Sequence, residues 1–139
     1  MKSTLPKRLD VALQRSIRAT FIEGEHSTLN DEQRIFVRDG EHCWLIRIKD
    51  IAWIESEGNY TRLHFGRNQA MLYRSLKNLE QRLDPGVFFR ANRKNIFNLR
   101  YVKEIVPWVN GGFLVHLTSG REIEVSRRQA QQLRHQMAA

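Results

Sequence analysis

The feature that most constrains this chain is a series of short apolar runs, separated by turn signals, that begins at Arg34. The longest runs have four or five residues and are rich in β-branched and aromatic side chains, which is typical of β-strands. Gly, Asn, Asp and Ser, which favour tight turns, occur in the segments between them: 39–40, 57–59, 66–68, 110–112 and 119–120. We therefore predict a mainly β (α+β) fold of small antiparallel sheets with short helices.

Two short helices are expected within this β region. Ser75 is a suitable N-cap for a helix with three regularly spaced leucines, and the Asp-Pro-Gly segment 84–86 ends that helix. A last helix is expected to begin at Ser126. Phe88 and Phe89 lie between the two helices and are expected to fill a core.

A different pattern occupies the N-terminal part of the chain. Apolar residues recur every four positions from Leu5 to Ile17, which predicts an amphipathic helix over 6–20. Its polar side is basic, as in membrane-surface helices, but its apolar side lacks Trp, which favours packing against protein. The predicted organisation is an N-terminal helix in 1–21, a polar linker in 22–32 and a β-rich domain in 33–139.

The positive charge is concentrated in the C-terminal part. The chain has a formal net charge of +8, and segment 86–139 holds nine Lys and Arg against three acids, a net charge of +6. An excess of this sign indicates a polyanionic partner, and its localisation indicates one binding face. The apolar runs are far too short to span a membrane, so we expect nucleic acid rather than a membrane as the partner.

Residues that would support enzyme or metal chemistry are missing from the sequence. Cys43 is the only cysteine, which excludes an internal disulfide and a paired-thiol metal site and fits a reducing cytoplasm. No two of the five histidines are three or four residues apart, and no phosphate-cradling glycine loop is present. Glu55 and Glu57 share a strand face like an acid/base pair, but a solvated or turn-supporting role is commoner. We predict no enzyme activity, no cofactor and no metal.

The first candidate binding segment is 89–98, where polar and basic side chains lie between aromatic ones. Arginines such as Arg90 and Arg93 suit the two acceptors of guanine, and Asn92 suits adenine. Lys94 suits a phosphate, as a flexible point charge. The alternative is a solvated loop with ordinary turn asparagines.

The second candidate segment is 125–129. Ser126 fits an N-cap, and Gln129 three residues later completes a capping box. Arg127 and Arg128 then fall in the first helical turn, where each cation costs ~0.3–1 kcal/mol against the helix dipole. A bound phosphate would offset this cost. The alternative is chance placement on an exposed helix.

A third and weaker candidate is the turn 57–62. Asn59, Thr61 and Arg62 present hydrogen-bonding groups between two expected strands.

Taken together, these segments resemble the LytTR DNA-binding domain, the output module of the LytR/AlgR family of bacterial response regulators. The resemblance extends over roughly 33–137, and its motifs in order are IKDIAWIESEGNYTRLHF, YRSLKNLEQRL, FFRANRKNIFNLRYVKEI and REIEVSRRQAQQL. It implies an elongated, mostly β fold whose loops enter successive major grooves of double-stranded DNA. It also implies binding to paired direct repeats, with two copies side by side on the DNA.

By position, the resemblance places base contacts on Thr61, Arg93 and Arg127. The flanking or backbone contacts that it implies are Asn59, Arg62, Arg90, Asn92, Lys94 and Arg128. This chain departs from the family at the second contact, where His-Arg-Ser is common and Asn-Arg-Lys stands at 92–94. The additional charge is expected to raise affinity and shift the sequence preference.

The N-terminal helix also fits this resemblance, because segment 5–13 looks like the last helix of a receiver domain. A regulator that contains such a receiver is one interpretation, and a natural short protein is the other.

Two other classes of function remain open from the sequence alone. An RNA-binding β module needs aromatic side chains exposed on a sheet. Trp53, Tyr60, Tyr73 and Trp108 are available for this, but most of them are expected to be buried. An interaction module or small-molecule sensor is the third possibility, and it predicts no salt-dependent DNA binding.

Overall fold

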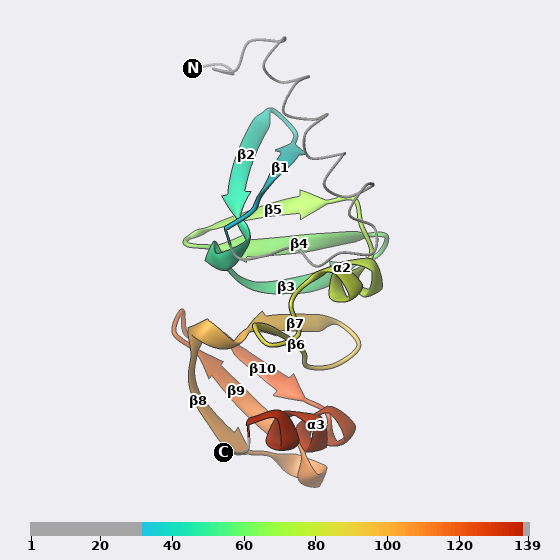
Figure 1. The fold of residues 1–139 in the computed structure, drawn as a ribbon, viewed down its shortest axis with the longest axis vertical. Helices are drawn as coiled ribbons and strands as arrows, with labels where there is room; N and C mark the ends of the chain where they lie inside the picture. The colour runs from blue at the N-terminus through green and yellow to red at the C-terminus, as the bar shows by residue number, and fades with distance from the viewer. Residues whose placement is uncertain (1–31, 138–139) are drawn as a thin grey trace.

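Three antiparallel sheets follow one another along the long axis of the molecule (Figure 1). The computed structural model describes residues 32–137. The predicted helix in 1–21 and all of the predicted linker except Glu32 lie outside the described residues. Within the described range the mainly β fold with short helices is confirmed.

The first sheet is the hairpin of β1 (Arg34–Asp39) and β2 (His42–Arg47), followed by the 3-10 turn η1 (Ile48–Asp50). Gly40 has a φ of 65°, as the tight turn between the strands requires. Ile35, Val37 and Ile46 turn one face of the hairpin toward the core.

The middle sheet has five strands in the order β5-β4-β3-β7-β6. Its members are β3 (Ile51–Glu57), β4 (Tyr60–Phe65), β5 (Asn68–Leu72), β6 (Phe88–Arg90) and β7 (Asn95–Asn98). Helix α2 (Leu76–Arg82) connects β5 to β6. Ser75 caps α2 as predicted, because its Oγ accepts a hydrogen bond from the Asn78 N–H at 3.0 Å.

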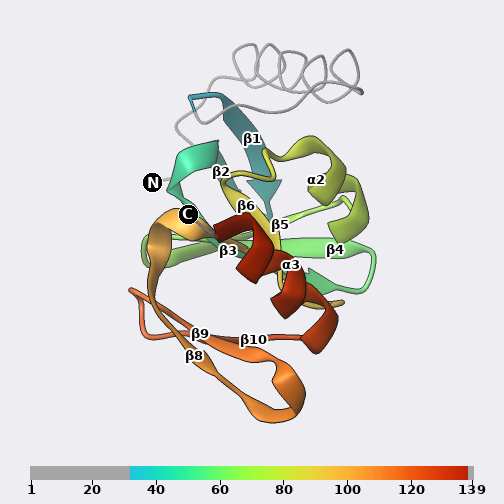
Figure 2. The ribbon, with the colours of Figure 1, turned by 60° about the horizontal axis from the view of Figure 1, so that its bottom comes forward.

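The third sheet has the order β10-β9-β8 and is packed against the last helix. It contains β8 (Val102–Pro107), β9 (Phe113–Leu117) and β10 (Glu122–Val125), with short turns η2 (Leu99–Tyr101) and η3 (Val109–Gly111) at the ends of β8. Helix α3 (Arg127–Met137) lies between this sheet and β6 in Figure 2 and buries Ala130 and Leu133.

The middle sheet separates two apolar cores. The upper core lies between this sheet, the β1–β2 hairpin and α2, and the lower core lies between this sheet, the third sheet and α3. Neighbouring residues point to opposite faces of a strand, so Phe88 enters the upper core while Phe89 enters the lower one. Ile96 and Phe97 on β7 divide in the same way. The predicted core role of the Phe pair is confirmed, and the loop between β6 and β7 is therefore attached to a strand pair that is packed on both faces.

Candidate nucleic-acid interface

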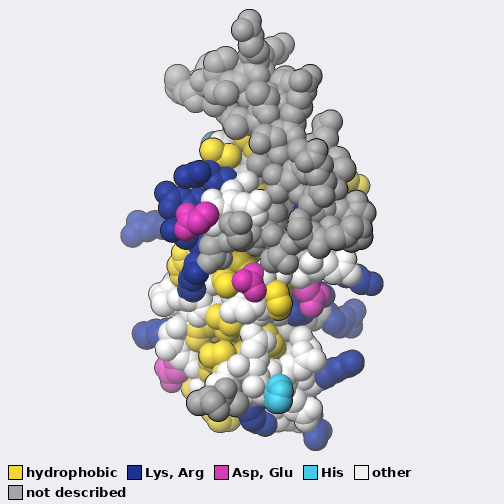
Figure 3. Space-filling model, viewed as in Figure 1, with side chains coloured by type: hydrophobic (Ala, Val, Ile, Leu, Met, Phe, Trp, Pro, Cys, Tyr) yellow, Lys and Arg dark blue, Asp and Glu magenta, His cyan; other side chains and the backbone are white. Residues whose placement is uncertain are grey.

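The three candidate segments lie along one margin of the molecule. In Figure 1 the β3–β4 turn, the β6–β7 loop and the start of α3 are all at the right-hand side. Figure 2 is turned about the horizontal axis and keeps them on that side. Lys and Arg side chains project from this margin, among other places, in Figure 3. The fold thus gathers segments that are up to about 70 residues apart in the sequence.

Arg90 braces the β6–β7 loop from within. Its Nε donates to the Asn92 carbonyl at 2.7 Å, and its Nη2 donates to the Arg93 carbonyl at 2.9 Å. Its Nη1 forms an ion pair with Glu80 on α2 at 2.6 Å. The guanidinium is thus occupied by partners of the chain itself, which were not predictable from the local sequence.

Asn92 fixes the same loop to the third sheet. Its Oδ1 accepts a hydrogen bond from the Lys94 N–H at 2.8 Å, which is the turn geometry typical of asparagine. Its Nδ2 donates to the carbonyl of Glu124 on β10. The asparagine side chain is therefore used to shape and anchor the loop.

The start of α3 is bonded directly to the β6–β7 loop. The Ser126 N–H donates to the Ala91 carbonyl at 3.1 Å, and the side-chain amide of Gln129 donates to the Arg90 carbonyl at 2.7 Å. Ser126 Oγ accepts from the Gln129 N–H at 3.3 Å, so the predicted N-cap is present. The second hydrogen bond of a capping box, from the Ser126 N–H to the Gln129 side chain, is not formed, because this N–H donates to the Ala91 carbonyl instead.

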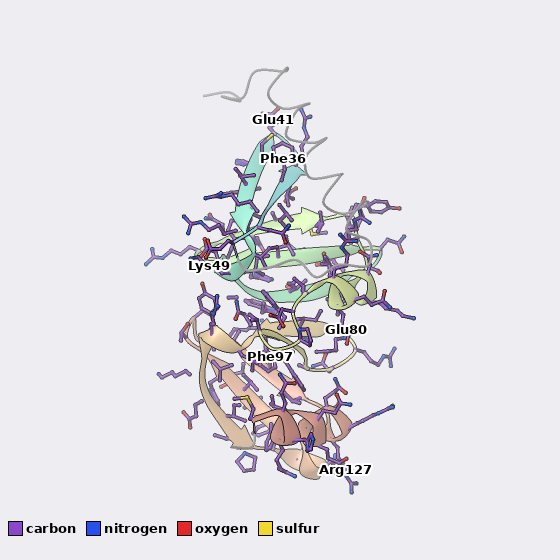
Figure 4. All side chains as sticks on the ribbon, in the orientation of Figure 1. Phe36, Glu41, Lys49, Glu80, Phe97 and Arg127 are labelled. Atoms are coloured by element: carbon purple, nitrogen blue, oxygen red, sulfur yellow. The ribbon has the colours of Figure 1, made fainter. Side chains whose placement is uncertain are left out.

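We call residues 91–94 and 126–128 together the paired loops. Arg93, Lys94, Arg127 and Arg128 are exposed on them, and none forms an ion pair with the part of the chain that the structure describes. The stem of Arg127 lies close to Gly111, where an added Cβ would be 3.4 Å from Cγ of the arginine. Figure 4 shows Arg127 at the lower right margin. Four exposed cations thus lie at the β6–β7 loop and the start of α3, where the helix dipole favours an anion.

Thr61 is placed differently from its prediction. Its side chain is 0 % exposed, and its hydroxyl lies 3.5 Å from the carbonyl of Leu72 on the adjacent strand. It belongs to the face of β4 that packs into the upper core with Leu63 and Phe65. A buried hydroxyl does not reach a base edge, so this placement counts against the predicted base contact.

Arg62 is held by neighbouring side chains on the sheet. Its Nη2 is 2.7 Å from a carboxylate oxygen of Glu57, and its Nη1 donates to Gln69 at 3.3 Å. The hydrogen bond to Glu57 raises the pKa of Arg62 further above its ordinary value. Asn59 lies exposed in the adjacent turn. Of the three predicted contacts on this hairpin, only Asn59 is both exposed and outside the ion-pair network.

The β3–β4 hairpin is nevertheless connected to the paired loops. The Ser56 N–H donates to the Lys94 carbonyl at 2.8 Å. Because Glu55 pairs with Asn95, the end of β3 continues alongside the β6–β7 loop. The hairpin and the paired loops therefore form one continuous margin.

On the middle sheet, His64 and Glu55 contact each other and Trp53 lies against the histidine. His64 stacks on Trp53 with ring centroids 3.5 Å apart, and its Nε2 lies 2.7 Å from a carboxylate oxygen of Glu55. Burial lowers the pKa of His64, although the hydrogen bond to Glu55 opposes this effect. Within residues 32–137, no three His, Cys, Asp or Glu side chains gather as a metal site would need. Over the same range, no helix is long and apolar enough to cross a membrane.

Comparison with known proteins gives consistent matches. The profile of the "LytTr DNA-binding domain" family matches residues 41–138. The transcriptional regulatory protein LytR of Staphylococcus aureus is 26% identical over 129 residues, which cover 87% of this chain and 52% of that protein. The sensory transduction protein LytT of Bacillus subtilis is 24% identical, covering 86% and 50%. The chain therefore spans about half the length of these relatives.

Two further matches agree with these. The CO-responsive transcriptional regulator RcoM of Rhodospirillum rubrum is 31% identical over 100 residues, covering 71% of this chain and 42% of that protein. A solved LytTr DNA-binding domain from Bacillus cereus superposes with a TM-score of 0.71 at 20% identity, covering 77% of this chain and 98% of that one. The predicted fold and the prediction of a DNA-binding module rather than an enzyme are thereby confirmed. The chain belongs to the family of LytTr DNA-binding domains.

Proposed function

We propose that this chain is the sequence-specific output domain of a bacterial transcriptional response regulator and that it reads double-stranded DNA with the paired loops. The observation that carries the proposal is the direct bonding of the two loops. The Ser126 N–H bonds one loop to the other, and the side chains of Gln129 and Asn92 bond the flanking residues, so the cations on both loops have a fixed relative position. A fixed arrangement lowers the entropic cost of binding to DNA.

In this proposal the paired loops supply both base and phosphate contacts. Arg93 and Arg127 enter the major groove and donate two hydrogen bonds each to guanine or an equivalent acceptor pair. Lys94 and Arg128 bind phosphates beside them. Thr61 makes no DNA contact, because its side chain is buried.

The remaining predicted residues have supporting roles in this proposal. Arg90 and Asn92 hold the β6–β7 loop in shape, since their side chains are occupied by intrachain bonds. Arg62 keeps the β3–β4 hairpin in register through its ion pair with Glu57. Asn59, exposed at the tip of that hairpin, is a flanking phosphate contact.

The proposal extends to the organisation of the whole regulator. We place the DNA-binding domain in 33–139, after a linker in 22–32 and a helix in 1–21 that ends a receiver domain. Two copies occupy paired direct repeats on the DNA, and the protein acts in the cytoplasm. Limited proteolysis tests the domain boundaries, and footprinting of a two-site duplex tests the binding to paired repeats.

The central test is a selection of bound sequences from a random duplex pool, followed by titration of the selected duplex. We expect one motif to be enriched and its affinity to fall steeply with salt. Preference for single-stranded RNA over the selected duplex would support an RNA-binding module instead. Absence of salt-dependent binding to either nucleic acid would indicate an interaction or sensor module and would refute the proposal.

A further inference from the structure

Two tyrosines near the β3–β4 turn are exposed, against the expectation that most of the candidate aromatics are buried. Tyr73 is 70% exposed, Tyr60 and Trp108 are each 44% exposed, and only Trp53 of the four candidates is buried, so the expectation was wrong. The two tyrosine rings contact each other, with centroids 4.9 Å apart and planes tilted by 56°. They form a preorganised aromatic pair that the two cores do not use.

The pair lies at the same edge of the middle sheet as the paired loops. Ser56 on β3 bonds to Lys94, and Glu57 on β3 pairs with Tyr60 on β4. Thr61 on β4 pairs with Leu72, the last residue of the antiparallel strand β5. Tyr73, which follows Leu72, therefore lies opposite Tyr60, which precedes Thr61. Three spacings of about 4.8 Å separate β7 from β5 across the sheet, so this edge extends roughly 14 Å beyond Lys94.

The charge along this edge permits an approach of DNA. Glu57 is the acid nearest to the tyrosines in the strand register, and its carboxylate is neutralised by Arg62 at 2.7 Å. A tyrosine carries no charge at neutral pH, donates one hydroxyl hydrogen and presents an apolar ring. Phosphate oxygens and deoxyribose rings of the DNA backbone match these two properties.

We propose that Tyr60 and Tyr73 form an uncharged contact to the DNA sugar–phosphate backbone, next to the backbone contact of Lys94. This inference rests on the proposed function. The hydroxyl groups donate to phosphate oxygens, and the rings pack against sugars. The contact adds affinity for any duplex but reads no sequence, and it releases no counterion because it brings no charge.

The experiment compares Tyr73→Phe, Tyr60→Phe and the double variant with Lys94→Ala on the full chain, using the duplex from the random-pool selection and an unrelated duplex. Each binding constant is measured at several salt concentrations. Leu45→Ala, which removes another side chain that is 52% exposed, is the control for a general loss of exposed apolar surface. Thermal melting of each variant separates folding from binding.

We expect the double tyrosine variant to bind both duplexes about 5- to 150-fold more weakly, from the loss of two hydrogen bonds. Its salt slope should equal that of the wild type, whereas Lys94→Ala should flatten the slope by about 1. Leu45→Ala should bind normally. Addition of the duplex should also protect Tyr60 and Tyr73 from nitration more than Tyr101, which lies in the turn η2 before β8.

Wild-type affinity of the double tyrosine variant would overturn the inference while leaving the proposed function intact. The inference would also fail if that variant lost only cooperative binding to a two-site duplex, because the pair would then contact a second copy of the chain. If the wild type bound no duplex, the proposed function itself would fail. These three outcomes are distinguished by the wild-type, single-site and two-site titrations.

Discussion

The paired loops and the β3–β4 hairpin have similar polar composition but opposite internal bonding. On the hairpin, Arg62 is engaged by Glu57 and Gln69, and Thr61 is buried. On the paired loops, Arg93 and Arg127 are exposed and have no ion pair within the described residues. The two regions thus differ in whether the fold supplies a carboxylate partner for the arginine.

A second difference concerns how each region is held. The hairpin is fixed by regular strand pairing, whereas the paired loops are fixed by side-chain amides that bond to backbone carbonyls. Amide side chains anchor a loop without neutralising its cations. The paired loops are therefore anchored while their cations keep their full positive charge.

The largest expected effect tests whether the free cations carry the recognition. Arg93→Ala and Arg127→Ala should each cost about 1–3 kcal/mol on the selected duplex and relax the preference at one base position. Fluorescence anisotropy with the selected duplex and its single-base variants measures both effects. Normal binding by both variants would show that the paired loops are not the reading surface.

The next effect tests the anchoring of the loop. Asn92→Ala removes the bonds to Glu124 and to the Lys94 N–H without changing any charge. We expect a loss of binding free energy of about 0.5–1.5 kcal/mol with an unchanged salt slope. In a double-mutant cycle with Arg93→Ala the two losses should be non-additive by at least about 0.5 kcal/mol, because the anchor acts through the arginine. Additive losses would separate the anchor from recognition.

A smaller effect is expected on the hairpin. Arg62→Ala removes one positive charge, as Arg93→Ala does, but its partner is Glu57 rather than DNA. It should lower the free energy of unfolding by at most about 1 kcal/mol, as is usual for a surface ion pair. DNA affinity should fall less than with Arg93→Ala, because the only effect on DNA is repulsion from the uncovered Glu57 carboxylate beside Tyr60. A loss of affinity as large as that of Arg93→Ala would remove the contrast between the two regions.

The smallest effect concerns pH and the hairpin face. Burial lowers the pKa of His64 below its ordinary value, so the unfolded chain takes up the proton first as pH falls. The stability that depends on neutral His64 is therefore present above about pH 6.5 and is lost as pH falls from there toward the folded-state pKa. Chemical denaturation at pH 7.5 and 5.5 should show this loss, and His64→Asn should reduce it. An equal loss in the variant would assign the pH dependence to other groups.

Much of the fold was predictable because its signals are local. Alternating apolar residues and turn dipeptides indicated the strands, and Ser75 and Ser126 cap helices as expected. The burial of Thr61 was also readable, because it alternates with Leu63 and Phe65 on one face of β4. The predicted base contact at Thr61 came from its position in the family motif, which takes no account of this alternation.

Other features depend on tertiary structure and have no local signal. The Arg90–Glu80 ion pair joins β6 to α2, and Gln129 bonds to Arg90 across 39 residues of sequence. The roles of Arg90 and Asn92 as supports followed only from these contacts. The exposure of Tyr60 and Tyr73 likewise depends on where the strands of the middle sheet end.

The middle sheet, with a core on each face, has a consequence for how the domain opens. Phe88 and Phe89 are neighbours on β6, yet each is buried in a different core. Separation of β6 from β7 would expose both cores at once, so the upper and lower parts cannot melt one after the other at this point. We expect amide hydrogen exchange at the hydrogen-bonded pairs of these two strands to require global unfolding rather than local fluctuation.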